Sequence, residues 1–320
     1  MKKLAVFLSL LICLFFSFGC APTSYTMVCP DGAPAIACYA LKTQEDLDIT
    51  VYSSSTATTQ ISKQINDKAV DFAIMPVNLA SKLCASGNNY KMAGVLTHGN
   101  LYGVSNTDIS TTDLRGKKVG VIQLSAVPGY TFKLLLSSLS IPYTEDISEH
   151  NESNVYLFQI SADAVAVRNA LASSTADVCI VAEPMCSKLV SAFSLNKCID
   201  IQNEYGSFPQ AVLMVKSSLI SSKPNVVKNV VSKFKSFNYL SINTTDMVDW
   251  INEKMMDGAS TSLSASALTQ TALENSNIYF SYAQTEKQKV KNYLLNLKTF
   301  DTLLGTVANE VGDNFFWRNV

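Results

Sequence analysis

The sequence holds little of what the common catalytic sites require. Its 320 residues include only two histidines, His98 and His150. It contains no H-E-x-x-H, G-x-S-x-G, P-loop or glycine-rich dinucleotide motif, and these patterns carry much of the metal, serine and phosphate chemistry of proteins. We therefore expect a protein that is not an enzyme and that holds neither a metal nor a cofactor.

Charged residues are also scarce. They make up 16% of the chain, and the formal net charge is -1, so no strong field attracts a polyanion. We expect no nucleic-acid partner. Hydrophobic residues make up 48%, which is ample for a core. At ~100–200 residues per domain, the length suggests two globular units.

The cysteines lack the spacing of a zinc site or a compact disulfide scaffold, because no C-x-x-C pair occurs. Six cysteines lie beyond residue 20, and they are Cys29, Cys38, Cys84, Cys179, Cys186 and Cys198. Several sit in apolar runs, where cysteine acts as a small hydrophobe. We expect mostly buried free thiols, with one local disulfide among Cys179, Cys186 and Cys198 as the alternative.

The amino terminus has the pattern of a secretion signal. Two lysines precede an apolar run over 4–16, which is shorter than the ~20 residues of a membrane-spanning helix. The following Ser17-Phe18-Gly19-Cys20 resembles a bacterial lipobox, although such a box usually begins with Leu and a small residue. The resemblance implies a cleaved signal peptide (1–19), acylation of Cys20 by chains such as palmitate, and a tether over 20–24. Secretion without a lipid is the alternative.

Beyond the tether, short apolar runs alternate with helical patterns, which is typical of an α/β fold with largely parallel sheets. The predicted strands cover 25–29, 47–52, 70–75, 92–96, 101–104, 118–122, 155–160, 178–182 and 210–215. After the last strand we expect only helices, over 225–237, 245–254 and 285–297. Since these imply no further sheet, the C-terminal part should return to cover the first lobe.

The candidate site residues lie in the polar or glycine-containing segments near the predicted strand ends and helix starts. In open α/β sheets, ligands collect beyond the carboxyl ends of the strands, where helix amino termini present unpaired N–H groups. The candidate ligand-binding residues are Gly32, Ala33, Pro34, Ser54, Ser55, Thr56, Asn78, His98, Ser125, Tyr130 and Glu183.

Their side chains suggest different roles. Asn78 offers a donor and an acceptor, and Glu183 accepts hydrogen bonds, with helix capping as the alternative for both. The hydroxyls of 54–56 suit an oxyanion, or an ordinary N-cap. Tyr130, like Tyr39, can stack on a flat ring or pack in the core. His98 lies in the presumed connection between lobes, where it can face the cleft.

Four phrases occur in a characteristic order: Asp31-Gly32-Ala33-Pro34, the run 71–80, Asp113-Leu114-Arg115-Gly116-Lys117-Lys118-Val119, and Ala182-Glu183-Pro184. Each phrase is weak alone. In this order, the chain over 25–238 resembles the substrate-binding proteins of ABC importers, in particular the group that binds sulfonates, nitrate, taurine and thiamine precursors.

This resemblance implies a two-lobed type II periplasmic-binding-protein fold that closes over a small solute at two hinge crossings. We expect lobe 1 to comprise 25–104 and 209–320, and lobe 2 to comprise 105–208. The implied ligand is a sulfonate, a vitamin precursor or a similar solute, and the implied partners are a membrane permease and an ATPase. We expect the chain on the extracytoplasmic side, lipid-anchored to a membrane. A surface lipoprotein with a structural or adhesive role is the alternative.

Overall fold

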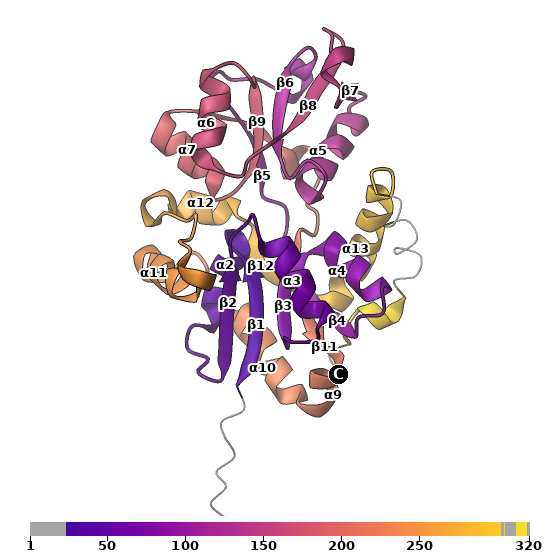
Figure 1. Ribbon diagram of the computed structural model, residues 1–320, viewed down its shortest axis with the longest axis vertical. Helices are drawn as coiled ribbons and strands as arrows, with labels where there is room; N and C mark the ends of the chain where they lie inside the picture. The colour runs from indigo at the N-terminus through magenta and orange to yellow at the C-terminus, as the bar shows by residue number, and fades with distance from the viewer. Residues whose placement is uncertain (1–23, 302–303, 305–311, 319–320) are drawn as a thin grey trace, which may run out of the picture.

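The computed structural model describes residues 24–301, 304 and 312–318. The predicted signal peptide, Cys20 and the tether up to residue 23 lie outside the described residues. Within them, the chain forms two six-stranded sheets, with the orders β12-β4-β11-β3-β1-β2 and β10-β5-β9-β6-β8-β7. Figure 1 shows each sheet at the centre of its own lobe, with helices around it.

The first sheet joins strands from both ends of the described chain. Its strands are β1 (Tyr25–Pro30), β2 (Leu47–Tyr52), β3 (Phe72–Pro76), β4 (Tyr90–Thr97), β11 (Ala211–Lys216) and β12 (Ile278–Tyr282). β1 pairs in parallel with β2 and β3, whereas β11 runs antiparallel between β3 and β4. The edge strand β2 buries Leu47, Ile49 and Val51 and exposes Asp48, and the period of two places the three buried side chains on one face of the sheet.

The second sheet is built from the middle of the chain. Its strands are β5 (Leu101–Ser105), β6 (Lys118–Ile122), β7 (Tyr143–Thr144), β8 (Val155–Ile160), β9 (Val178–Ala182) and β10 (Asn196–Asp200). β6 lies parallel between β8 and β9. Its run of Val119, Gly120, Val121 and Ile122 is buried on both faces, which is typical of a central parallel strand.

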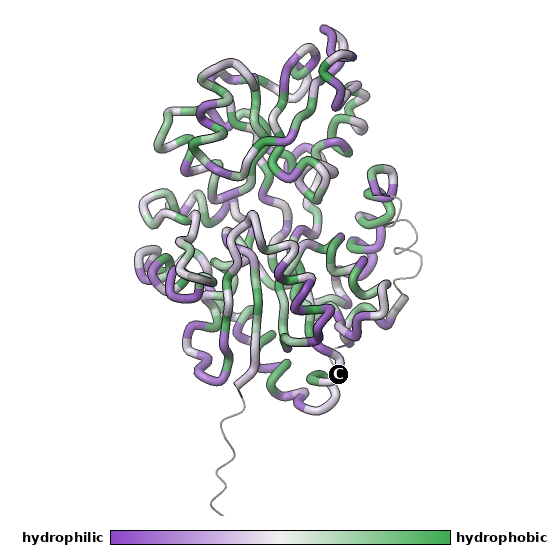
Figure 2. The backbone as a smooth tube through the Cα atoms, in the orientation of Figure 1, coloured by the Kyte–Doolittle hydropathy of each residue, from purple (hydrophilic) through white to green (hydrophobic). Residues whose placement is uncertain are grey.

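Helices connect the strands and cover both sheets. They include α2 (Ala33–Cys38), α3 (Ala57–Asn66), α4 (Val77–Ala85), α5 (Val127–Ser138), α6 (Ala164–Ala172), α7 (Met185–Phe193), α8 (Ile201–Glu204), α9 (Ser217–Ser222), α10 (Pro224–Ser236), α11 (Thr244–Lys254), α12 (Gln270–Asn275) and α13 (Ala283–Leu297). Apolar residues concentrate in the strands and on the inner helix faces (Figure 2). No helix of the described chain is both long and apolar enough to cross a bilayer.

The C-terminal helices pack on the first lobe. α10 buries Val227, Val230, Val231 and Phe234, which recur every three or four residues and so share one helix face. α10 contacts β12, and α13 contacts β4. The predicted α/β fold, with two crossings and a C-terminal helical segment on lobe 1, is therefore confirmed.

Two details of the prediction were wrong. The chain changes lobes at 98–100, not after 104, because β5 pairs with β9 and β10 in the second sheet. The C-terminal part is not purely helical, because β12 adds an edge strand beside β4. In β12, Ile278 and Phe280 are buried and Tyr279 between them is exposed. This alternation is too short to predict a strand from the sequence.

The two crossings pack against each other. Gly99 in the first crossing has a φ of +76°, and a Cβ added there would lie 2.8 Å from the Phe208 ring of the return crossing, 205–210. Only glycine combines this backbone conformation with so close a contact. The two connections therefore form one packed unit and not two independent linkers.

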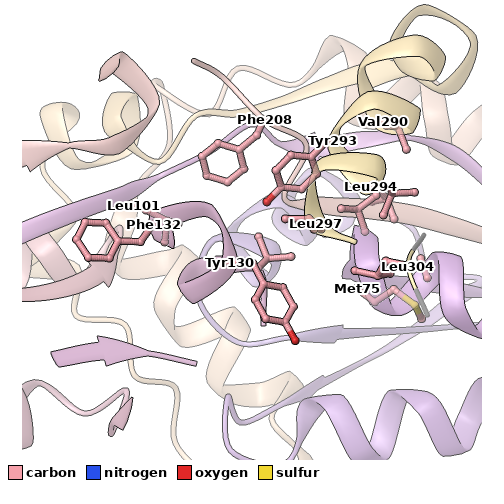
Figure 3. Close-up of a cluster of buried hydrophobic side chains, with 14 of the residues drawn as sticks. Met75, Leu101, Tyr130, Phe132, Phe208, Val290, Tyr293, Leu294, Leu297 and Leu304 are labelled. Carbon is pink, nitrogen blue, oxygen red and sulfur yellow. The ribbon is translucent and has the colours of Figure 1, made fainter. Parts of the chain in front are cut away.

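A buried cluster joins the lobes beside these crossings (Figure 3). It contains Tyr130 and Phe132 of α5 together with Tyr293 and Leu297 of α13, and Phe132 lies beside Leu101 of β5. The Thr131 and Tyr293 hydroxyl oxygens lie 2.6 Å apart, and both side chains are buried. The contact between lobes is thus partly apolar and partly hydrogen-bonded.

All six cysteines of the described chain are free thiols, and Cys29, Cys38, Cys179 and Cys186 are buried. Burial raises the pKa of Cys84 and of Cys179 to about 12, so these thiols stay protonated and unreactive at neutral pH. The expectation of free thiols is confirmed, and the alternative local disulfide does not form.

Candidate ligand-binding cleft

A cavity of about 250 Å³ lies between the lobes, with walls from both. In the first lobe it begins where β1 and β3 end, at Pro30 and Pro76. In the second lobe it begins where β6 and β9 end, at Ile122 and Ala182. This is the carboxyl edge of parallel strands, the position at which α/β sheets bind ligands.

The crossings and the strand ends beside them supply another part of the wall. Asn100 and Gln210 belong to the crossings, and Thr97 and Ala211 are the adjoining ends of β4 and β11. Their backbone is held in place, because Gln210 N–H donates to the Thr97 carbonyl at 2.9 Å and Ala211 N–H donates to Thr97 Oγ1 at 3.0 Å. A ligand in the cavity therefore contacts the segments about which the lobes would move.

Of the predicted residues, Gly32, Ala33, Pro34, Ser54 and Glu183 line the cavity. Gly32 is the N-cap residue of α2, and Ala33 and Pro34 are the first two residues of that helix, shortly after the end of β1. Ser54 is exposed and lies just before α3. The rule that places ligands at strand ends located these five.

Ser55 and Thr56 do not line the cavity. They share hydrogen bonds with Ser53, at 3.1 and 3.0 Å between hydroxyl oxygens. No side chain caps α3, so the alternative role as an ordinary N-cap is not realised either. Ser125 is exposed in the turn before α5 and is likewise not part of the cavity wall.

His98 and Tyr130 are packed elsewhere. The His98 ring stacks on Tyr279 of β12 at 3.8 Å between centroids, and its Nε2 lies 3.2 Å from the Tyr279 carbonyl oxygen. Tyr130 stacks on Phe300 at 5.7 Å. Tyr39 packs edge-on against Trp250 at 5.6 Å. The two tyrosines take the core role that was the alternative to ligand stacking.

Asn78 is buried at the second residue of α4, between the cavity-lining Pro76 and Leu79. Its Oδ1 has no hydrogen-bond partner in the described chain. Asn78 itself is not among the residues that line the cavity.

Glu183 lines the cavity but turns toward its own helix. Its carboxylate accepts hydrogen bonds from Ser187 N–H at 3.0 Å and from Ser187 Oγ at 2.8 Å. Burial raises the pKa of Glu183, and the bonds from Ser187 oppose that rise. The carboxylate therefore caps α7 while it also borders the cleft.

Asp31 and a C-terminal segment were missed. The Asp31 carboxylate accepts hydrogen bonds from Ser262 N–H and Oγ, each at 2.7 Å, and from Thr261 Oγ1. These bonds hold 262–264 against the cavity. The sequence showed this segment only as a Ser- and Thr-rich connection, although Asp31 stood in one of the recognised phrases.

The described residues contain no cluster of three or more His, Cys, Asp or Glu side chains that could hold a metal ion. No histidine or cysteine of the described chain lines the cavity. What the cavity offers is amide, hydroxyl and carboxylate groups set in apolar walls, which suits binding.

No protein-family model matches this chain, and no curated protein matches its sequence. Solved structures do resemble it. An ABC transporter protein from Parabacteroides distasonis is 15% identical, with a TM-score of 0.68, covering 93% of this chain and 100% of that one. The aliphatic sulphonate binding protein SsuA from Escherichia coli is 12% identical, with a TM-score of 0.60, covering 86% and 93%.

A third similar structure is the alkanesulfonate-binding protein SsuA from Xanthomonas axonopodis pv. citri, bound to MOPS. It is 14% identical, with a TM-score of 0.56, covering 89% of this chain and 96% of that one. The chain therefore has the periplasmic-binding-protein fold, as its sequence predicted.

Proposed function

We propose that this chain is the extracytoplasmic solute-binding component of an ABC importer. It captures a small organic solute between its lobes and delivers it to a membrane permease, whose transport is driven by an ATPase. The observation that carries the proposal is the cavity at the strand ends, with walls from both lobes and from both crossings. A lipoprotein with a purely structural or adhesive role has no need of such a cavity.

The fold and the cavity chemistry support this function over an enzymatic one. The similar structures include an ABC transporter protein and two sulfonate-binding proteins. Among the described residues that line the cavity, no histidine or cysteine can act as a base or nucleophile. Closure of two lobes about hinge segments is the usual motion of this architecture, and here those segments contribute Asn100 and Gln210 to the wall.

The test is a thermal-shift screen of the chain from residue 21 onward against sulfonates, amino acids, vitamin precursors, amines and nucleobases. A bound solute should stabilise the fold by ~2.7 kcal/mol at a hundredfold excess over its dissociation constant. Ala164→Trp should abolish the shift, because Ala164 lines the cavity. Val165→Trp is the matched control, since the neighbouring Val165 is 56% exposed. A ligand shift that survives Ala164→Trp would place the solute elsewhere.

The proposal includes an acyl anchor at Cys20, which the lipobox-like sequence supports. We expect labelled palmitate to be incorporated into the full chain in cells, and Cys20→Ser to lose both the label and membrane association. Two acyl chains bind a bilayer far more firmly than one. Equal fractionation of the two proteins with membranes would contradict the anchor.

A further inference from the structure

Two residues of the cavity wall have a buried amide oxygen that accepts no hydrogen bond from the described chain. Asn100 is 1% exposed and lines the cavity, and its Oδ1 has no hydrogen-bond partner among the described residues. Gln210 Oε1 is also buried and unpartnered in the same wall. An amide oxygen left in this state costs ~1–3 kcal/mol. A ligand that donates hydrogen bonds to these atoms would recover that free energy.

The orientation of the Asn100 amide is determined by its surroundings. Its Nδ2 donates to the Glu183 carbonyl at 3.2 Å, and a carbonyl can only accept, so Oδ1 must be the end without a partner. The backbone is fixed as well, because the Asn100 carbonyl accepts from Glu183 N–H at 2.8 Å. The Gln210 backbone is held too, since its carbonyl accepts from Val77 N–H at 3.0 Å. The Asn100 acceptor is therefore preorganised, and the Gln210 side chain extends from a fixed backbone.

The ionisable side chains of the wall favour a neutral or positive ligand. They are Asp31, Asp163, Glu183 and Lys188, a formal excess of two negative charges. Asp31 and Glu183 are buried, and neither belongs to an ion pair within the described chain. Lys188 Nζ donates to the Ser262 carbonyl at 3.1 Å. A sulfonate here would meet several carboxylates and a single cation.

At four of the helix amino termini that border the cavity, part of the N–H groups that could offset this charge is already used or missing. Asp163 accepts from Ala166 N–H at 2.9 Å at the start of α6, and Glu183 caps α7. The Gln210 carbonyl takes the first N–H of α4, and Pro128 removes a donor at the second position of α5. N–H groups of this kind are what an oxyanion needs, so these four helix starts offer it less than uncapped ones would. The starts of α2 and α3 also border the cavity and have no side-chain cap, so discrimination against an anion rests on the excess of carboxylates.

Much of the wall is apolar, and the volume is small. Ile61, Leu79, Ile122, Val127, Met185 and Leu263 line the cavity. Its volume of about 250 Å³ is below the ~300–1,000 Å³ of pockets for drug-sized ligands. Such walls suit a compact apolar or aromatic body.

We infer that the cleft selects a small neutral or cationic solute whose N–H groups donate to Asn100 Oδ1 and Gln210 Oε1, and that it discriminates against sulfonates. The inference rests on the proposed solute-binding function and narrows it to a ligand class. Gln210 sets the specificity, because it lines the cavity and its buried amide oxygen has no hydrogen-bond partner within the described residues.

The experiment measures calorimetric binding by the chain from residue 21 onward, with probes that share a body and differ in charge and donors. The pairs are butylamine with butanesulfonate and benzamidine with benzenesulfonate, and nicotinamide is the neutral donor. We expect each amine or amidine to bind at least ~10-fold more tightly than its sulfonate partner, the difference that one hydrogen bond to a charged group supplies.

Two substitutions test the role of Gln210. Gln210→Met removes the acceptor at similar volume and should weaken binding of the donor probes ~10-fold or more. Gln210→Glu keeps an acceptor oxygen and adds charge, so it should strengthen benzamidine binding and weaken benzenesulfonate binding. Gln288→Met is the matched control, because Gln288 is on α13, outside the cavity, and pairs with Asn292 at 2.8 Å.

The inference and the function fail in different ways. Tighter binding of the sulfonate in either pair, or donor binding that Gln210→Met leaves unchanged, overturns the inference and leaves the solute-binding function standing. If no probe of either kind binds at millimolar concentration, the solute-binding function itself is contradicted, and the inference falls with it.

Discussion

Replacing Gly129 with alanine is expected to destabilise the protein by ~3 kcal/mol or more, at or above the upper end of ordinary overpacking. A Cβ at this third residue of α5 would lie 2.0 Å from the Leu124 carbonyl oxygen and 2.4 Å from its carbonyl carbon. Both are backbone atoms of the turn that precedes the helix, so no rotamer change can relieve the overlap. The turn or the helix start must move.

That movement should also reach the ligand site. Gln123, Val127 and Pro128 line the cavity on either side of the crowded position, and Leu124 N–H is held by Gln159 Oε1 at 2.7 Å. Urea denaturation should therefore show a lower unfolding free energy in Gly129→Ala, and a solute that stabilises the wild type should bind the variant more weakly.

Gly206→Ala is the control for the Gly129 prediction. Gly206 has a φ of +102°, and no atom lies within 4 Å of an added Cβ. Its replacement costs only the backbone strain of the left-handed region, ~1–2 kcal/mol. Equal losses of stability in the two variants would mean that crowding at Leu124 has no energetic effect.

The strands were the most predictable part of the fold. The predicted bounds 47–52, 118–122, 155–160 and 178–182 coincide with β2, β6, β8 and β9. Each is a short segment rich in apolar, β-branched or aromatic residues, so the decisive information is local. By contrast, β12 depends on β4 for its pairing, and β5 joins lobe 2 only because β9 is there to pair with it. Both strand pairings depend on tertiary structure, which a local sequence pattern does not predict.

The same division applies to the cleft. Gly32, Ser54 and Glu183 were found because strand ends mark the binding edge of a sheet. Asn100 and Gln210 were missed because they lie in the crossings, whose path depends on how the two lobes pack. The sequence also did not predict the direction in which side chains point. Glu183 points toward Ser187, and His98 points toward β12.

The placement of His98 leads to a large expected pH effect. The pKa of His98 falls from 6.5 to about 4, first because burial disfavours the charged ring and second because Lys289 lies nearby. Below pH 6.5 the unfolded chain binds a proton that the folded chain does not take up until about pH 4. Stability from this group is therefore complete above pH 6.5 and is lost as the pH falls toward 4, by ~3 kcal/mol in total.

Substitution of His98 isolates this contribution. His98→Phe keeps a flat ring against Tyr279 but cannot bind a proton, and it loses the contact with the Tyr279 carbonyl. We expect it to be less stable than the wild type at pH 7.5 by ~1 kcal/mol, yet to lose ~3 kcal/mol less on acidification to pH 4. Urea denaturation between pH 7.5 and 4 gives the free energy of unfolding of both proteins. The contributions of the other titrating groups cancel in the difference between wild type and variant.

We expect Lys289→Met to lose an intermediate amount of stability on acidification, between the losses of the wild type and of His98→Phe. A purely structural role of His98 would not produce this order. Lys289 Nζ lies 3.1 Å from Ser207 Oγ, and its charge helps to hold the pKa of His98 low. Without that charge, the folded protein should bind the His98 proton at a higher pH, so the acid loss should be smaller than in the wild type and larger than in His98→Phe. Parallel stability curves for the three proteins would show that His98 takes up its proton at the same pH in the folded and unfolded chains.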